Sequence, residues 1–585
     1  MTWGKRRALV ILIVILVFVG LIFIVSHHPR RIASNSVLVM DVSGDIEEQR
    51  PVDWLGALSG SRIPVQHDYV DSVDAAAGDP HIRGLVVRIG PLETGWAKLE
   101  ELHTHIENFR RSGKPSICYL GYDGIGNPEY YLATACQQVW LVPTAPLGIR
   151  GMMAEATFLR GTFDKLRIVP DFYHIAEYKT ASNELTEKQF TPAHREEVTS
   201  ILNDVYNRYV SEAASSRGMS SIQFDALLRQ GPFLAREAAD KKLVDRLAYW
   251  DQVQDYFGSF TGGWKPLDLG RYAATVRNGS GPEIAIIYAT GLIISGDSEG
   301  GSTMGGDSVA ADLRRARNDS GIRAIVVRVD SGGGSALASE VIRRELDLAH
   351  NIKPVVVSMS DVAASGGYWL AMSSDKIVAE PNTLTASIGV LGGKFNIAGL
   401  YSLLGLSTDY VATSDNATLE SAQQSFTPEQ RVYFQKSLQE TYQNFIQGVA
   451  SGRHLSVDAV DRIGKGRVWT GQQAKSLGLV DELGGLDRAV SVARDLAHIS
   501  AASSVHLVRL PEEKTPWQEL FAPSENDMRT RVLESFRLSQ TARPNPEATL
   551  RAATLSPAAL RTLVRRLLGP ENAIQARMPL DLNIR

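Results

Sequence analysis

One short segment sets the fold class of this chain: Ile322-Arg-Ala-Ile-Val-Val-Arg328. An apolar run of this length, rich in β-branched residues, predicts a buried strand. A nearly identical segment, Ile82-Arg-Gly-Leu-Val-Val-Arg88, occurs in the first half of the chain. The same strand therefore occurs twice, which indicates an internal repeat.

Three further pairs of matching segments occur in the same order in both halves. They are Val37-Leu-Val-Met-Asp-Val-Ser-Gly44 with Ile284-Ala-Ile-Ile-Tyr-Ala-Thr-Gly291, Phe190-Thr-Pro192 with Phe426-Thr-Pro428, and Leu243-Val-Asp245 with Leu479-Val-Asp481. Since chance similarity would not preserve this order and near-constant spacing, we interpret the chain as the product of a duplication.

The pattern between these segments is typical of an α/β fold. Apolar strands alternate with amphipathic stretches such as residues 339–346, and this alternation favours βαβ units. A Gly-rich, polar stretch at residues 261–282 is the expected boundary between the halves. We therefore expect two tandem repeats, residues 36–275 and 276–500. An extension over residues 501–585 follows, with one helix near 557–568 and no readable function.

The first 35 residues predict a membrane anchor. Residues 8–25 are an unbroken apolar run, about the length needed to cross a bilayer. Lys5, Arg6 and Arg7 precede this run, so the positive-inside rule keeps the N-terminus in the cytoplasm and exports the remainder. A cleaved signal peptide is the alternative, but no small-residue cleavage site follows Val25.

Composition argues against nucleic acid as a partner and does not decide whether the two cysteines form a disulfide. The 585 residues include 61 basic and 65 acidic side chains, and the resulting net charge of −4 offers nucleic acid no general attraction. Cys118 and Cys136 lack the C-x-x-C spacing of a metal or redox site. They could pair in an oxidising compartment or remain unpaired in the core.

A glycine-rich turn follows the strand that opens this section. The turn is Asp330-Ser-Gly-Gly-Gly-Ser335, and a helix is expected to begin near Ala336. Backbone N–H groups freed by such glycines suit the oxyanion of an acyl-transfer reaction or a phosphate. A plain tight turn is the alternative interpretation.

A candidate nucleophile follows the next predicted strand, residues 354–359. Ser365 stands at the expected strand-to-helix junction, within Ala364-Ser-Gly-Gly-Tyr368, where small neighbours would let a substrate backbone approach. The alternative is that its hydroxyl only caps the helix.

Comparison of the two halves favours the catalytic interpretation. The alignment places Asn127 opposite Ser365 and Asn416 opposite Lys179, so each half keeps a different reactive group. A lysine acts as a base only when it is neutral, and burial would lower its pKa from about 10.4. We therefore predict a composite site whose activity rises with pH. The alternative for Lys179 is a surface lysine beside Glu177.

The chain resembles the signal peptide peptidase A family in its long, membrane-anchored form. The resemblance covers nearly the whole chain and includes the anchor, the duplicated halves, the Tyr178-Lys179 segment and the two glycine-rich motifs. It implies a Clp protease/crotonase-like fold and a serine protease with a Ser/Lys dyad that degrades cleaved signal peptides. It also implies a homotetramer at the bacterial inner membrane, with its catalytic part in the periplasm. We expect no cofactor and no metal ion.

The resemblance also implies roles for individual residues. Ser365 becomes the nucleophile and Lys179 the general base, Gly333 and Gly366 supply the oxyanion hole, and Ser387 could hold the lysine ammonium. The family usually has Ser-Pro-Gly-Gly where this chain has Ser331-Gly-Gly-Gly334, which leaves the geometry of the turn open.

Two other functions remain to be compared with this one. A crotonase-like acyl-CoA hydratase or isomerase would share the oxyanion turn but would use carboxylates, and it would belong in the cytoplasm. A non-catalytic membrane scaffold of the same fold would need neither Ser365 nor Lys179.

Overall fold

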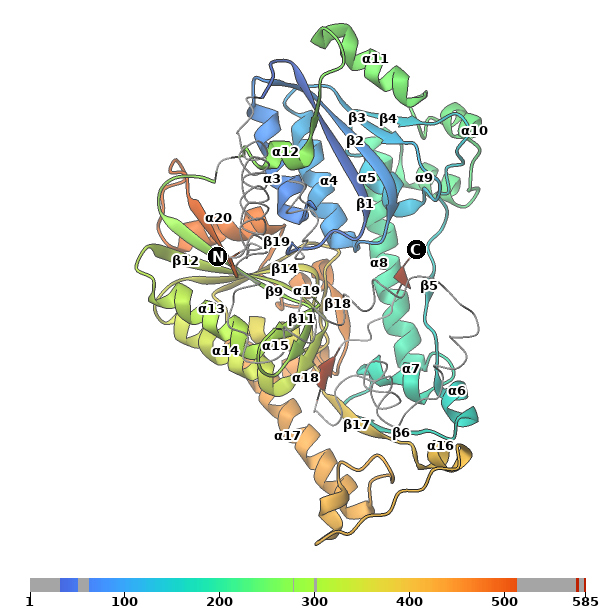
Figure 1. Cartoon of the computed structure of the whole chain (residues 1–585), viewed down its shortest axis with the longest axis vertical. Coiled ribbons are helices and arrows are strands. Elements are labelled where there is room, and N and C mark those ends of the chain that lie inside the picture. The colour runs from blue at the N-terminus through green and yellow to red at the C-terminus, as the bar shows by residue number, and fades with distance from the viewer. Residues whose placement is uncertain are drawn as a thin grey trace, which may run out of the picture.

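The computed structural model describes residues 32–50, 63–276, 278–298, 302–512, 575–577 and 583–584. Two α/β units are stacked along the long axis of the molecule, the first half at the top and the second half below it (Figure 1). This arrangement confirms the predicted α/β fold class.

Each half contains a parallel sheet built in the same order. The first has the order β7-β4-β3-β2-β1-β8, and the second contains the corresponding order β19-β15-β14-β12-β9-β20. Their bounds are Ser36–Gly44 (β1), Ile82–Leu92 (β2), Ser116–Leu120 (β3), Gln138–Leu141 (β4), Arg246–Leu247 (β7), Pro266–Asp268 (β8), Glu283–Thr290 (β9), Ile322–Ser331 (β12), Val355–Ala364 (β14), Lys376–Ala379 (β15), Glu482–Leu483 (β19) and His506–Leu510 (β20). Strands β16 (Leu384–Ala386) and β18 (Val468–Thr470) extend the second sheet beyond β14.

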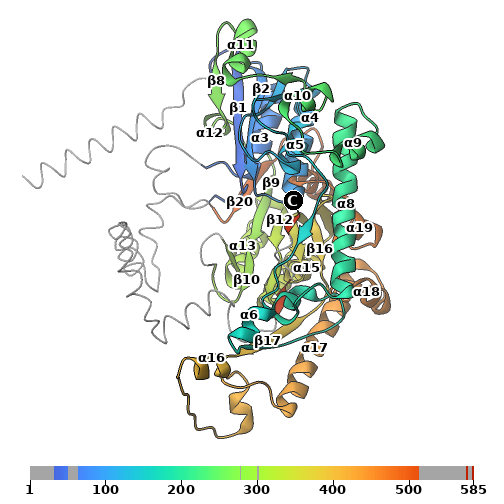
Figure 2. The same ribbon diagram turned by 90° about the vertical axis from the view of Figure 1, so that its right-hand side faces the viewer.

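Helices pack on these sheets in both halves, and shorter helices lie beside the remaining strands (Figures 1 and 2). In the first half they are α3 (Gln66–Gly78), α4 (Trp96–Arg110), α5 (Asn127–Ala133), α6 (Arg160–Lys165), α7 (Asn183–Thr186), α8 (Pro192–Ser216), α9 (Ser221–Leu228), α10 (Ala235–Asp240), α11 (Trp250–Thr261) and α12 (Leu269–Ala273). In the second half they are α13 (Gly306–Asn318), α14 (Ala336–His350), α15 (Gly366–Ala371), α16 (Ala398–Leu403), α17 (Pro428–Arg453), α18 (Val457–Ile463), α19 (Gly471–Ser476) and α20 (Leu486–Leu496).

The repeated segment supplies the centre of each sheet. In β12 the side chains of Ile325, Val326 and Val327 are completely buried, because helices pack on both faces of a parallel sheet. Arg328 is buried too, and its guanidinium lies 2.8 Å from Glu48 and 2.7 Å from Glu101, which both belong to the first half. A buried ion cluster therefore joins the two halves.

A third sheet contains strands from both halves and from the end of the chain. Its order is β11-β10-β13-β21-β17-β6. The bounds are Thr303–Gly305 (β11), Leu292–Ile294 (β10), Gly333–Ser335 (β13), Gln575–Arg577 (β21), Leu391–Asn396 (β17) and Val169–His174 (β6). A separate pair joins β22 (Asn583–Ile584) to β5 (Ala154–Glu155). The pairing of β6 with β17 carries a first-half segment onto the second half.

Most of the predicted helices and strands agree with the structure, but the predicted limits of the two halves differ from it in detail. The stretch 339–346 lies inside α14. Strand β8 and helix α12 lie inside the predicted boundary at 261–282 and pack on the first half, because β8 pairs with β1. The predicted extension from residue 501 begins with β20, which pairs with β9.

Two predictions concern segments that lie outside the described residues. They are the anchor over residues 8–25 and the helix near 557–568. Within the ranges that the structure describes, no helix combines the length and apolar character needed to span a membrane.

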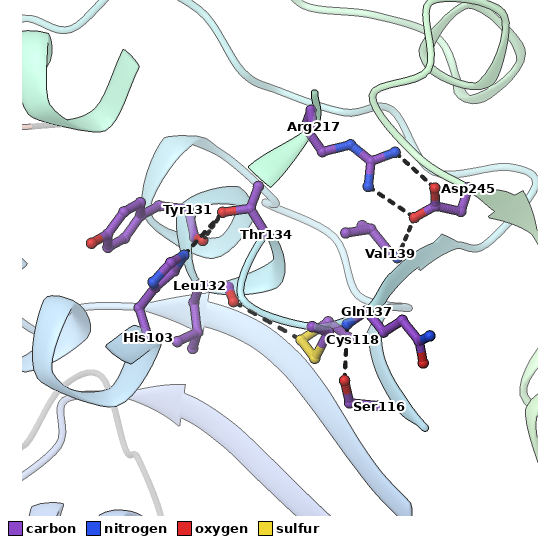
Figure 3. Close-up of a disulfide and its surroundings, with 11 residues drawn as sticks. His103, Ser116, Cys118, Tyr131, Leu132, Thr134, Gln137, Val139, Arg217 and Asp245 are labelled. Carbon is purple, nitrogen blue, oxygen red and sulfur yellow. Dashed lines mark hydrogen bonds and ion pairs between the residues drawn. A yellow bond between two sulfur atoms is a disulfide. The ribbon is translucent and has the colours of Figure 1, made fainter. Parts of the chain in front are cut away.

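Cys118 and Cys136 form a disulfide, which resolves the choice that the sequence left open (Figure 3). Cys118 lies on β3 and Cys136 in the turn after α5, so the bond joins a central strand to the turn that precedes β4. Both side chains lie in the core of the first half.

Candidate active site

Lys179 and Ser365 are in direct contact, although 186 positions separate them in the chain. Lys179 Nζ lies 2.7 Å from Ser365 Oγ, and both side chains are completely buried. Lys179 comes from the first half and Ser365 from the second. The structure therefore brings together the two residues that the comparison of the halves selected.

Backbone geometry presents the Ser365 hydroxyl to the lysine. Ser365 stands between β14 and α15 with φ 55° and ψ −112°, a conformation that L-residues rarely adopt. Its N–H donates to the carbonyl of Ala386 at 2.7 Å, which holds the turn. The side chain makes no capping hydrogen bond to α15, so the capping interpretation is wrong.

The second half also holds the backbone of the lysine. The N–H of Tyr178 donates to the carbonyl of Lys465 at 3.0 Å. Gly466 packs against Lys179 so closely that a Cβ on this glycine would lie 2.5 Å from the Lys179 backbone nitrogen. Together with the β6–β17 pairing, these contacts hold the backbone of Lys179 against the second half, which carries Ser365.

Ser387 contributes both of its oxygens to Lys179. Lys179 Nζ donates to Ser387 Oγ at 3.0 Å and to the Ser387 carbonyl at 3.1 Å. Ser387 is completely buried and has φ 51°, and its own N–H donates to the carbonyl of Arg467 at 2.9 Å. The amine thus has three oxygen partners, and an ammonium at this position would keep a hydrogen bond for each proton.

Burial changes the acid–base behaviour of Lys179. Removal from water lowers its pKa to about 7, and the nearby carboxylate of Glu197 acts in the opposite direction. The surface interpretation of Lys179 is therefore wrong. Glu177 instead forms an exposed ion pair with Lys465 at 3.3 Å.

Glu197 is a site residue that the sequence reasoning missed. It lies on α8, is buried, and accepts hydrogen bonds from Thr180 Oγ1 at 3.1 Å and from the N–H of Val468 at 2.6 Å. Desolvation raises its pKa to about 7. One signal could have found it: a carboxylate on a helix face whose other residues, such as Val198 and Ile201, are buried and apolar.

Gly333 and Gly366 lie next to each other beside Ser365. A Cβ on Gly366 would lie 3.1 Å from Gly333 Cα, so the close approach requires glycine. Gly333 has φ 103°, and its N–H donates to Ser331 Oγ at 3.1 Å. Ser331 Oγ in turn donates to the Gly291 carbonyl at 2.6 Å. The Gly333 donor is thus engaged within the chain.

The counterpart residues occupy different surroundings. Asn127 opens α5, and its side-chain oxygen accepts a hydrogen bond from the N–H of Arg150 at 3.0 Å. Asn416 lies in the short 3-10 helix Asp415–Thr418, in an exposed stretch of the second half. Among the described residues, no hydrogen bond joins the two asparagines.

Comparison with known proteins identifies a peptidase family and several relatives. The family model described as Peptidase family S49 matches residues 108–257 and 347–500. The chloroplastic serine protease SPPA of Arabidopsis thaliana is 33% identical over 507 residues, which cover 84% of this chain and 74% of the relative. Protease 4 of Salmonella typhi is 32% identical over 493 residues, covering 80% and 79%. A solved structure of a ClpP1 mutant from Listeria monocytogenes matches 35% of this chain and 92% of its own, with 13% identity and a TM-score of 0.24.

Proposed function

This chain belongs to peptidase family S49, and on that basis we propose that it is a serine endopeptidase with Ser365 as nucleophile and Lys179 as general base. The 2.7 Å contact between Ser365 Oγ and Lys179 Nζ is the observation that carries the proposal. It places a base within hydrogen-bond reach of the proton that must leave the serine.

The proposed reaction begins with a neutral Lys179. As Ser365 Oγ attacks the carbonyl carbon of the scissile peptide bond, its proton passes to Lys179 Nζ. The resulting ammonium is stabilised by the two oxygens of Ser387, and it then gives its proton to the departing amine. Water, deprotonated by the same lysine, hydrolyses the acyl-enzyme, and the proton returns to Ser365.

We propose that the oxyanion is stabilised by the backbone N–H groups of Gly333 and Gly366. Their proximity to each other and to Ser365 supports this role. The Gly333 N–H would have to exchange Ser331 Oγ for the substrate oxygen, since it already has that partner. The glycine in place of the family's usual proline would permit such a local rearrangement.

The substrate would bind as an extended strand. Strand β21 supports this part of the proposal, because it runs antiparallel to both β13 and β17 beside the candidate oxyanion turn. Peptides commonly bind by adding a strand to a sheet in this way. We propose that the substrates are apolar peptides of the signal-peptide class, released from secreted precursors.

The proposal also includes the membrane anchor, the tandem repeats and the homotetramer that the sequence predicts. Residues 8–25 would anchor the chain in the bacterial inner membrane, with the N-terminus in the cytoplasm and the catalytic part in the periplasm. The two halves would be tandem Clp protease/crotonase-like repeats, and the protein would form a homotetramer. Neither the acyl-CoA hydratase nor the scaffold is favoured, since the group in contact with Ser365 is a buried lysine.

The test is hydrolysis of an apolar, signal-peptide-like substrate by the wild-type chain and four variants. Ser365→Ala and Lys179→Ala should each abolish turnover. Ser298→Ala and Lys475→Ala are matched controls that remove an exposed serine and an exposed lysine, and they should retain activity. Full activity in either of the first two variants would refute the assignment.

A further inference from the structure

One buried lysine of the first half reaches the strands that carry the candidate site. Lys98 lies on α4, and its Nζ lies 2.8 Å from Asp330 Oδ2 and 3.6 Å from Asp361 Oδ2. Asp330 opens the glycine-rich turn, and Asp361 lies four positions before Ser365. Burial acts to lower the pKa of Lys98, but the two carboxylates outweigh it and raise this pKa, so the lysine stays charged.

The pairing of β12 with β14 is interrupted at these aspartates. Regular pairing stops at Val329 opposite Met359 and resumes at Ser331 opposite Ala363. One residue of β12, Asp330, therefore faces three residues of β14. The Asp330 side chain bridges this irregularity, because its Oδ1 accepts a hydrogen bond from the N–H of Val362 at 3.1 Å. Bulges of this kind bend a strand and redirect its side chains, and they are frequent beside active sites.

The same bulge holds the N-terminal end of α4. Asp361 Oδ1 accepts a hydrogen bond from the N–H of Lys98 at 2.9 Å, and Oδ2 accepts one from the N–H of Gly95 at 3.1 Å. A Cβ on Gly95 would lie 2.5 Å from either carboxylate oxygen, so this approach requires glycine. The backbone of α4 is therefore attached to β14, and the Lys98 side chain extends from there to β12.

The repeat shows that this ion group is divided between the halves. The offset of 240 positions (322 − 82) places Ala338 opposite Lys98 and Gly90 opposite Asp330. In the first half, the pairing of β2 with β3 keeps a regular register from Leu85 opposite Ser116 to Arg88 opposite Tyr119. The cation and the acid thus follow the same division as Lys179 and Ser365, with one member in each half.

We propose that Lys98 is a positioning residue of the peptidase reaction. By holding Asp330 and Asp361 together, it fixes the spacing between the glycine-rich turn and Ser365. The inference rests on the proposed function, in which the N–H of Gly333 leaves its partner within the chain to bind the substrate oxygen. A turn that rearranges in this way needs a fixed starting point, and the ion group supplies it at Asp330. Lys98 therefore affects the oxyanion that forms in the transition state and not the binding of the intact peptide.

An apolar peptide aldehyde and the matching peptide alcohol test this role in the full chain. Ser365 Oγ adds to the aldehyde carbon and its proton passes to Lys179, so the aldehyde oxygen becomes an oxyanion in the site, whereas the alcohol binds without forming one. Lys98→Met should weaken binding of the aldehyde roughly 30-fold and lower kcat by a similar factor. Binding of the alcohol, and KM, should change by no more than about twofold. A variant that only loosens the fold would weaken binding of both ligands.

Two further variants complete the test. Arg509→Met is the control, because Arg509 on β20 also pairs with the first half, at 2.8 Å from Asp71 on α3, and its loss should leave kcat and both affinities unchanged. Asp330→Asn removes the partner of Lys98 and leaves that lysine beside Asp361. It should show the same selective loss of aldehyde binding, and it keeps the test available if Lys98→Met does not fold.

The outcomes separate this inference from the catalytic assignment. Wild-type affinity for the aldehyde in Lys98→Met or Asp330→Asn, or an equal loss of aldehyde and alcohol binding, would overturn the positioning role of Lys98. Ser365→Ala should lose the preference for the aldehyde altogether. If Ser365→Ala instead binds the aldehyde as tightly as the wild type does, the catalytic assignment is wrong and the inference about Lys98 is overturned with it.

Discussion

Gly466 and Lys179 are in backbone contact across the boundary between the two halves. A Cβ on Gly466 would lie 2.5 Å from the Lys179 nitrogen and 2.6 Å from its Cα. The glycine has φ +79°, so both its conformation and its lack of a side chain serve this contact. The position of the base thus depends on a residue that forms no hydrogen bond with the lysine amine.

Gly466→Ala should therefore displace the base. A displacement of about 1 Å is expected to lower kcat roughly 100-fold. Gly478→Ala is the matched control, since Gly478 has φ +76° but no atom nearer than 4.0 Å to its added Cβ. Steady-state kinetics on the two variants would separate displacement of Lys179 from backbone strain. Thermal unfolding would monitor the strain, which both variants share. Equal losses in both would show that strain alone matters.

The activity of the wild-type chain should rise with pH through about 7. Burial lowers the pKa of Lys179 to about 7, so the amine is neutral and able to accept a proton only above that value. At one pH unit below this pKa, kcat/KM should be about a tenth of its plateau. The profile is to be measured over the range in which tryptophan fluorescence shows a folded chain. Activity that falls as pH rises from 6 to 8 would contradict the role of Lys179.

Glu197→Gln should shift this profile towards lower pH. The carboxylate of Glu197 favours the charged form of Lys179, so its removal lowers the apparent pKa, by roughly one unit. A glutamine can retain the hydrogen bonds to Thr180 and Val468, so the plateau should change little. The neighbouring Arg467 faces Glu197 as well and remains in place.

The control for this experiment is Glu196→Gln. Glu196 is the adjacent residue on α8, and its half-exposed side chain pairs with Arg467 at 2.7 Å. The substitution removes the same charge one residue away and should leave the profile unchanged. Superposition of the Glu197→Gln and wild-type profiles would exclude an electrostatic role for Glu197.

Ser387→Ala should weaken the base without removing it. The variant loses the hydroxyl partner of Lys179 at 3.0 Å but keeps the carbonyl partner at 3.1 Å. We expect kcat to fall about tenfold, with a smaller change in KM. Ser374→Ala removes another buried hydroxyl, one that bonds to the Ala371 carbonyl, and serves as the control for lost packing. Wild-type kcat in Ser387→Ala would refute the orienting role.

A chain that ends at residue 574 should bind peptides more tightly. Strand β21 lies between β13 and β17, where the proposed substrate strand would lie, so it would compete with substrate. Truncation should lower KM severalfold and leave kcat nearly unchanged. Adding a synthetic peptide of residues 570–585 should reverse the effect, and an unchanged KM would show that β21 does not compete.

The pairing of Ser365 with Lys179 could be predicted because the duplication provides its own comparison. Each half retains one reactive residue at a position where the other half has asparagine, and this asymmetry distinguishes the two residues from every other serine and lysine. The α/β fold class was predictable for a related reason, since the strand ending at Arg328 occurs twice.

Other features of the site could not be predicted, because they depend on tertiary contacts between distant segments. The helical pattern around Glu197 indicates that its side chain is buried, but it gives no sign of the hydrogen bond with Val468, 271 positions away. The pairing of β6 with β17 could not be predicted either. The alternation of apolar and polar residues along a strand indicates which face is buried, but it does not identify the strand's partner.

The disulfide between Cys118 and Cys136 offers a way to determine orientation that needs no substrate. Such bonds persist outside the reducing cytoplasm, and these are the two cysteines of the chain. Thiol-blocking reagents applied to freshly lysed cells would therefore test the proposed anchoring, because they report whether the first half matured in the cytoplasm or outside it. A chain whose first half stays in the cytoplasm would carry two reactive thiols, whereas a chain exported as proposed would carry none.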